Sequence, residues 1–130
     1  MVIVIIGILA AFAVPRFRAS VERSKAAEAF NYLSAIQAAQ ERYHARQGIY
    51  ASDKDDLDIK FTDPKYFTVG AISPGSGEGA SLETSWTMTL TRSGPAAGYS
   101  AYTVIFTEDG FDSTSTIADE AHVDINPMQT

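Results

Sequence analysis

The chain opens with a run of apolar residues. Positions 1–14 read MVIVIIGILAAFAV and carry no polar side chain. An ordinary surface helix is apolar on one face only, so this run predicts a helix that lipid, or copies of itself, must bury all round. A bilayer crossing needs about 20 apolar residues, which the run alone does not reach. A signal-peptide core is the competing interpretation by length, but no basic region precedes the run.

Beyond Pro15 the pattern becomes amphipathic. Apolar residues recur at intervals of three and seven, with polar residues at the other angles of a helix. The predicted buried stripe comprises Ala26, Ala29, Phe30, Leu33, Ile36, Gln40 and Tyr43. Gly48 is the predicted C-terminal cap. We therefore expect one helix of about 47 residues, roughly 70 Å long, with a kink where Pro15 removes a backbone hydrogen bond.

The second half of the chain alternates between apolar and polar residues, as strands do. Strands are predicted at 66–69, 85–91 and 99–107, and Asp109-Gly110 is a turn signal. The side chains predicted to share the inner face are Trp86, Met88, Leu90, Tyr102, Val104 and Phe106. The tail, 112–130, has no clear periodicity, and we expect it to wrap the sheet edge or a neighbouring subunit.

These elements predict an α+β fold. A long N-terminal α-helix, with an apolar half and an amphipathic half, packs against a small antiparallel β-sheet head of three or four strands. We divide the chain into residues 1–22, the apolar N-terminal helix that serves as membrane anchor or filament core, and residues 23–130, the globular head.

The distribution of charge also divides the chain into two parts. Six basic against three acidic side chains give residues 1–47 a charge of +3, and four against thirteen give residues 48–130 a charge of −9, which together make the −6 of the chain. This acidic balance argues against nucleic acid as a partner of the whole molecule, because nucleic-acid binding requires a basic face. The chain has no cysteine, so disulfides, thiolate metal sites and thiol nucleophiles are excluded.

The sequence offers little for catalysis. Its two histidines, His44 and His122, show no metal-binding or catalytic spacing. We predict no catalytic residue, no cofactor and no enzyme activity. A candidate calcium site exists in the predicted loops, because calcium favours carboxylate oxygens. Its residues are Asp109, Asp112 and Asp119, and a plain acidic surface loop is the alternative.

Residues 5–17, IIGILAAFAVPRF, resemble the N-terminal helix of type IV pilins and type II secretion pseudopilins. The stretch 38–57, which contains QERY, QGIY and DL, is similar to the pilin segment that leads out of that helix. The resemblance covers about the first 57 residues, and the rest of the chain matches in general character only.

The resemblance implies a structural subunit. It implies a major pilin that is held in the cytoplasmic membrane and then drawn by the pilus assembly machinery into an extracellular homopolymer for attachment or motility. In such filaments the helices pack as a core, and small residues allow close approach. The assembly interface expected on this basis is Met1, Ile3, Ile6, Gly7, Ala10, Ala11, Val14 and Phe17. A secretion pseudopilin and a monomeric membrane-anchored binding module are the alternatives.

The start of the chain departs from the family pattern. Family members begin about two helical turns earlier, with a Phe-Thr-Leu-Ile-Glu-Leu type stretch that this sequence lacks. We therefore expect Met1 to be either a misassigned internal start or the product of a truncation. Restoring the missing turns would lengthen the apolar run to about 20 residues, enough to span a bilayer.

Overall fold

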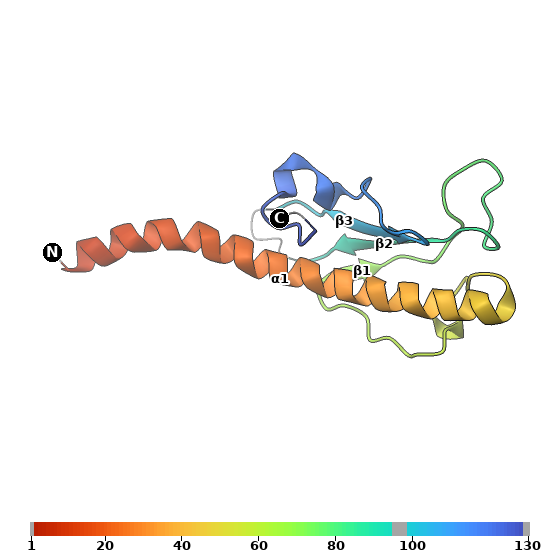
Figure 1. Cartoon of the computed structure of the whole chain (residues 1–130). Coiled ribbons are helices and arrows are strands. Elements are labelled where there is room, and N and C mark those ends of the chain that lie inside the picture. The colour runs from red at the N-terminus through yellow and green to blue at the C-terminus, as the bar shows by residue number, and fades with distance from the viewer. Residues whose placement is uncertain (1, 95–98, 129–130) are drawn as a thin grey trace.

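A long helix, α1 (Val2–Gln47), forms the axis of the molecule, and a four-stranded sheet lies along its second half (Figure 1). The computed structural model describes residues 2–94 and 99–128, with the backbone alone at position 15. The strands are β1 (Phe67–Val69), β2 (Thr87–Arg92), β3 (Thr103–Thr107) and β4 (Gly110–Phe111). Each strand pairs antiparallel with the next, in the order β1-β2-β3-β4. The predicted α+β fold is confirmed.

The helix ends where the sequence predicts. Gly48 has a φ of 78°, in the left-handed region, and its N–H donates to the carbonyl oxygen of His44 at 2.8 Å. Glycine adopts this conformation without the steric cost that a Cβ brings. α1 is 46 residues long and continuous through position 15. The kink at Pro15 stays a prediction.

The second half of α1 supplies one side of the hydrophobic core. Tyr43 packs partly buried against that core, and the rest of the predicted stripe is buried: Ala26, Ala29, Phe30, Leu33, Ile36 and Gln40. On the opposite side, the six predicted inward side chains of the sheet are all buried. Phe30 meets Phe106 of β3 edge to face, with ring centroids 5.9 Å apart. The two periodicities therefore predicted both sides of the core, although β3 begins at Thr103 instead of Tyr99.

Gln40 occupies an apolar position for a reason that the structure makes plain. Its amide group pairs with the backbone of Ala51, donating to the carbonyl oxygen at 3.0 Å and accepting from the N–H at 2.8 Å. Both residues are buried. Because buried backbone groups need hydrogen-bond partners, Gln40 allows the chain leaving α1 to turn back against the core.

A buried ion pair joins α1 to β2. Arg92 Nε donates to Glu22 Oε1 at 2.6 Å, and the Tyr102 hydroxyl donates to the same oxygen at 2.7 Å. The side chains of Glu22 and Arg92 are 0% and 1% exposed. Arg92 also donates to the carbonyl oxygens of Tyr66 and Ser93, so its guanidinium is surrounded by acceptors. Burial and the neighbouring Glu22 carboxylate raise the pKa of Tyr102 above its ordinary range.

The tail covers the outer edge of β3, which is one of the two positions predicted for it. β4 pairs with only the last two residues of β3. Beyond it, the N–H of Ile105 donates to the Ser115 hydroxyl at 2.8 Å, and the N–H of Thr103 donates to the Thr116 hydroxyl at 2.6 Å. Two 3-10 turns, Thr116–Ala118 and Glu120–His122, then carry the tail over the head. Side-chain oxygens thus replace the backbone partners that a longer fourth strand would supply.

Candidate assembly surface

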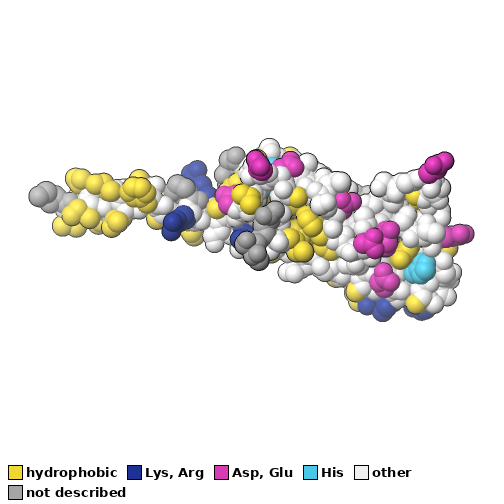
Figure 2. Space-filling model, turned by 45° about the horizontal axis from the view of Figure 1, so that its top comes forward, with side chains coloured by type: hydrophobic (Ala, Val, Ile, Leu, Met, Phe, Trp, Pro, Cys, Tyr) yellow, Lys and Arg dark blue, Asp and Glu magenta, His cyan; other side chains and the backbone are white. Residues whose placement is uncertain are grey.

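The N-terminal part of α1 projects beyond the head, and Figure 2 shows it as a rod of apolar side chains. We call residues 2–14 the apolar stem. Every residue of the stem is exposed, and large side chains such as Ile3 and Phe12 are 85% and 74% exposed. Soluble monomers rarely expose a continuous apolar surface of this kind, which marks a surface that contacts another body.

The predicted interface residues lie on this exposed rod. Met1 lies outside the described residues. The other seven are exposed, and their spacing of three and four residues places them along one face of α1: Ile3, Ile6, Gly7, Ala10, Ala11, Val14 and Phe17. At Gly7 an added Cβ would meet no atom within 4 Å, so nothing in the described chain requires glycine there. A small residue at this position leaves room for another helix to approach closely.

The apolar stem also suits a lipid environment. α1 contains an 18-residue window with a mean hydropathy of 2.0, and none of that window is buried inside the molecule. By length and composition, this helix is compatible with crossing a membrane. Lipid tails can cover such a surface, and so can apolar helices of other subunits, because both present hydrocarbon.

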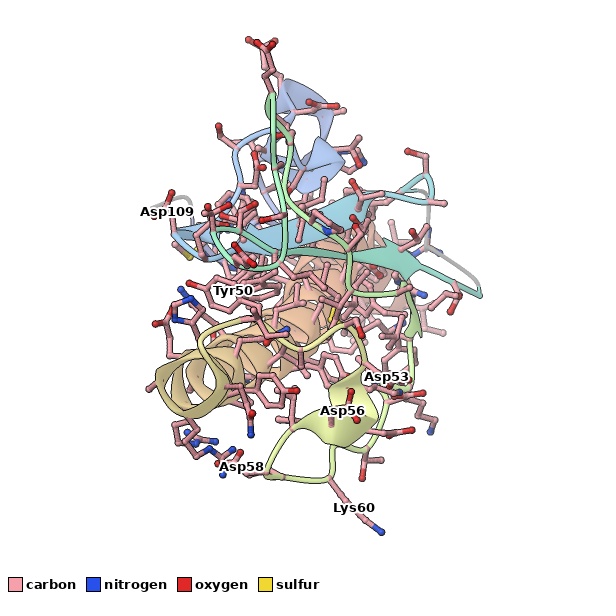
Figure 3. All side chains as sticks on the ribbon, turned by 90° about the vertical axis from the view of Figure 1, so that its right-hand side faces the viewer. Tyr50, Asp53, Asp56, Asp58, Lys60 and Asp109 are labelled. Carbon is pink, nitrogen blue, oxygen red and sulfur yellow. The ribbon has the colours of Figure 1, made fainter. Side chains whose placement is uncertain are left out.

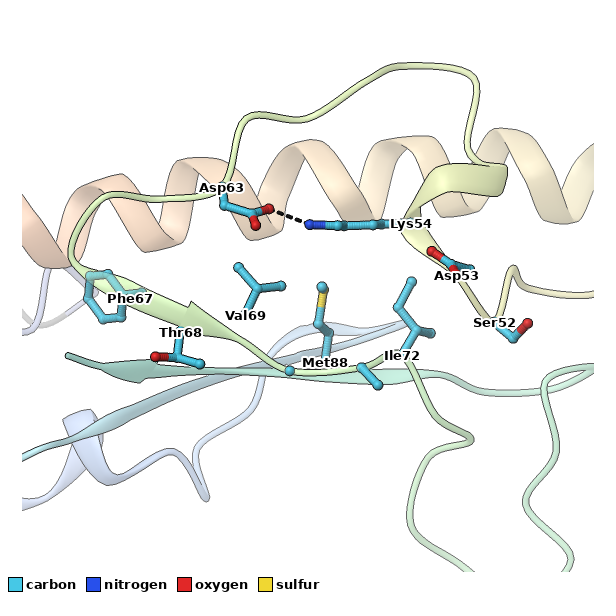
Figure 4. Close-up of a pocket in the computed structure, with 11 residues that line it drawn as sticks. Ser52, Asp53, Lys54, Asp63, Phe67, Thr68, Val69, Ile72 and Met88 are labelled. Atoms are coloured by element: carbon cyan, nitrogen blue, oxygen red, sulfur yellow. Dashed lines mark hydrogen bonds and ion pairs between the residues drawn. The ribbon is translucent and has the colours of Figure 1, made fainter.

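A hollow of about 500 Å³ lies beside β1, between the strand and the 3-10 turn Lys54–Asp56 (Figure 4). Two carboxylates line it, and both have structural partners. Asp53 Oδ1 accepts from the N–H of Asp55 at 3.0 Å and caps the turn. Asp63 forms an ion pair with Lys54. The rest of the lining is largely backbone and apolar side chains, so this hollow presents no catalytic constellation in the described residues.

The candidate calcium ligands are not brought together. In the part of the chain that the structure describes, no three histidine, aspartate or glutamate side chains gather around a common point. Asp109 lies in the turn between β3 and β4, where its N–H donates to the Thr107 hydroxyl at 3.2 Å. Asp112 accepts from the N–H and the hydroxyl of Thr114, both at 2.8 Å. Asp119 precedes the last 3-10 turn.

Other polar residues sit at the end of the head that lies away from the stem (Figure 3). Asp58 accepts from Arg42 Nε at 2.7 Å, and this hydrogen bond lowers the pKa of Asp58. The ring of His44 stacks on Tyr50 with centroids 4.3 Å apart. Figure 3 shows Asp53, Asp56 and Lys60 on the loop that follows α1. The Arg42–Asp58 pair is exposed, as is usual for a solvated surface, whereas Tyr50 belongs to the core.

Comparison with known proteins adds a relative. The chain is 33% identical, over 104 residues, to the fimbrial protein EcpC of Eikenella corrodens. The match includes 79% of this chain. The chain is therefore similar to a fimbrial protein. It spans 65% of the length of that relative. No protein-family model matches the chain, and no solved structure gives a significant match.

The sequence patterns did not predict the buried ion pair between Glu22 and Arg92. Glu22 lies one turn before Ala26 in the same 3-4 spacing as the buried stripe, so the stripe extends to it. Arg92 follows Leu90 by two residues and shares its inward face. Each periodic pattern, extended by one step, would have placed a charged residue inside. Burying a charged side chain is unfavourable unless an opposite charge pairs with it. Two charged residues of opposite sign at predicted buried positions therefore indicate an internal ion pair.

Proposed function

We propose that this chain is a structural subunit of a type IV pilus-like surface filament in which copies pack through their apolar stems. One observation carries the proposal. The second half of α1 is buried by the chain's own sheet, whereas the first half exposes apolar side chains around its whole circumference. The resemblance to a fimbrial protein supports the same function.

In this proposal the apolar stem exchanges one apolar environment for another. Burying one large aliphatic side chain contributes about 1.5–3 kcal/mol relative to water. Residues 2–14 can gain this first in the cytoplasmic membrane and later between stems, so the transfer from lipid to filament costs little hydrophobic free energy. Close packing of helices through small residues then favours the filament. Residues 1–22 form the filament core in this proposal, and residues 23–130 form the outward head.

Large side chains on the packing face test the proposal. Gly7→Phe and Ala11→Phe leave the isolated chain undisturbed, since both positions are exposed and nothing lies near the Gly7 Cβ position. In a packed core the added rings cost about 1–3 kcal/mol at each contact. Ala45→Phe, at an exposed position near the far end of α1, is the matched control.

The readout is the amount of subunit in sheared filaments, imaged by electron cryomicroscopy, against the amount left in the membrane fraction. We expect filament yield to fall for Gly7→Phe and Ala11→Phe, with the subunit retained in the membrane, and to persist for Ala45→Phe. Unchanged filaments from both stem variants would rule out packing through this face. A wild-type chain recovered only as membrane-bound monomers would instead support an anchored binding module.

A further inference from the structure

Directly after the apolar stem, α1 carries a band of cations. Its members are Arg16, Arg18, Arg23 and Lys25. Figure 2 shows dark blue side chains next to the yellow apolar rod, with the magenta acidic side chains over the head. Arg16 and Arg18 are exposed, and the exposed Phe17 lies between them in the sequence.

The nearest acidic residue does not neutralise these two arginines. Glu22 is the only carboxylate in the first 27 residues, and its oxygens accept from Arg92 and Tyr102 inside the head. Within the described residues, neither Arg16 nor Arg18 forms an ion pair. The buried pair therefore has an effect outside the core, because it withdraws the one local counter-charge from the helix surface.

The two arginines leave the helix on opposite sides. Consecutive helical residues are about 100° apart, so Arg16 and Arg18 differ by about 200° around the axis. Arg23 and Lys25 repeat this arrangement two turns later, and the Lys25 ammonium lies 4.7 Å from the centroid of the Tyr66 ring at the head. A flat protein partner meets a helix from one side. A layer that surrounds the helix meets both arginines at once.

The axial position of the arginines fits the polar layer of a bilayer. Arg16 and Arg18 directly follow the apolar stem, and the fourteen helical steps from Val2 to Arg16 reach about 21 Å into a hydrocarbon core about 30 Å thick. Arg16 and Arg18 differ by about 3 Å in height, and the polar layer on each side of a bilayer is about 5–8 Å thick. With the apolar stem in hydrocarbon and the head in water, both guanidinium groups lie among phosphates. Arginine binds phosphate through two parallel hydrogen bonds.

We propose that Arg16 and Arg18 form a binding site for the head groups of anionic phospholipids, which holds the subunit at a defined depth before assembly. This inference rests on the membrane stage of the proposed function. Each cation near an anionic surface is worth about fivefold in binding at low salt. The pair therefore gives roughly a 25-fold preference for anionic over zwitterionic bilayers.

The test lets one chain choose between two bilayers. The 130-residue chain in detergent is mixed with equal amounts of two nanodiscs, of phosphatidylcholine alone and of phosphatidylcholine with phosphatidylglycerol, which carry different affinity tags. After detergent removal, each disc population is isolated and its bound chain is quantified. Arg16→Gln/Arg18→Gln is the test variant. Arg46→Gln/Lys60→Gln, at exposed positions at the far end of the molecule, is the charge-matched control.

We expect the wild type and the control variant to prefer the anionic discs, the preference to be weaker at high salt, and the test variant to lose most of it. Equal partition of the wild type, or equal preference of both variants, overturns the inference while insertion itself leaves the proposed function intact. Failure to enter either disc removes the membrane stage and the inference together.

Discussion

The stability of the head depends strongly on keeping both partners of the Glu22–Arg92 ion pair. Both side chains are almost completely buried, and they lie 2.6 Å apart. Replacing one partner leaves the other as an uncompensated buried charge, which costs about 3–5 kcal/mol. Folded domains of this size have a total stability of about 5–15 kcal/mol. Glu22→Leu or Arg92→Met should therefore remove a large share of the free energy of unfolding.

Removing both partners should cost much less than the sum of the two single changes. An apolar pair of similar volume leaves no buried charge, and such replacements are often neutral or stabilising. Glu22→Leu/Arg92→Met should therefore lie within about 2 kcal/mol of the wild type, with the loss of the Tyr102 hydroxyl's acceptor as the main remaining cost. Arg42→Met, which breaks an exposed pair with Asp58, is the control and should leave stability nearly unchanged.

Urea unfolding in detergent micelles measures these differences. Trp86 is the one tryptophan of the chain and is fully buried in the head, so its fluorescence reports the head and not the stem. With an m-value of about 1–3 kcal/mol/M, each single variant should lower the unfolding midpoint by about 2 M. Single variants that cost less than about 1 kcal/mol, or a double variant that costs the full sum, would refute the reasoning.

Three further predictions follow from other contacts. Gln40→Leu leaves the N–H and carbonyl of Ala51 without their partner and should cost about 2 kcal/mol in the same urea assay; an unchanged midpoint would contradict the role given to Gln40. Burial and the adjacent Asp124 raise the pKa of Tyr99 to about 12, whereas unfolded tyrosine titrates near 10, so the stability from this hydroxyl is complete below about pH 10 and is lost as pH rises through the folded pKa. Urea midpoints at increasing alkaline pH should accordingly fall less steeply for Tyr99→Phe than for the wild type, and parallel slopes would count against the shift. Gly48→Ala should destabilise the head by about 1 kcal/mol because of the left-handed backbone there, whereas Gly7→Ala, in regular helix, should not; equal effects would show that backbone conformation is not the cause.

Simple periodicity was enough to predict most of the fold. The 3-4 spacing from Ala26 to Tyr43 identified the face of α1 that the sheet covers, and the alternation around Met88 and Val104 identified the inner face of the sheet. These predictions succeed because helix and strand geometry alone decide which neighbours share a face. The exposed apolar stem was equally clear, since fourteen apolar residues in a row leave no polar face.

Contacts that depend on tertiary pairing were not predicted. Glu22 and Arg92 are 70 residues apart, and nothing in either local pattern identifies the other as its partner. Gln40 was placed in the buried stripe correctly, but its backbone partner at Ala51 depends on the path of the chain after α1. The candidate set Asp109, Asp112 and Asp119 was proposed from composition, and composition does not determine where loop side chains point.

The hydroxyl groups that cover the outer edge of β3 protect the head from its neighbours. A strand edge with unpaired backbone groups is a template for strand addition, and subunits held side by side would meet such an edge at very high local concentration. Here Ser115 and Thr116 occupy the backbone groups of Ile105 and Thr103 that a foreign strand would need. The edge at the other side of the sheet, β1, is only three residues long. The head can therefore be crowded against its copies without growing into a cross-β aggregate.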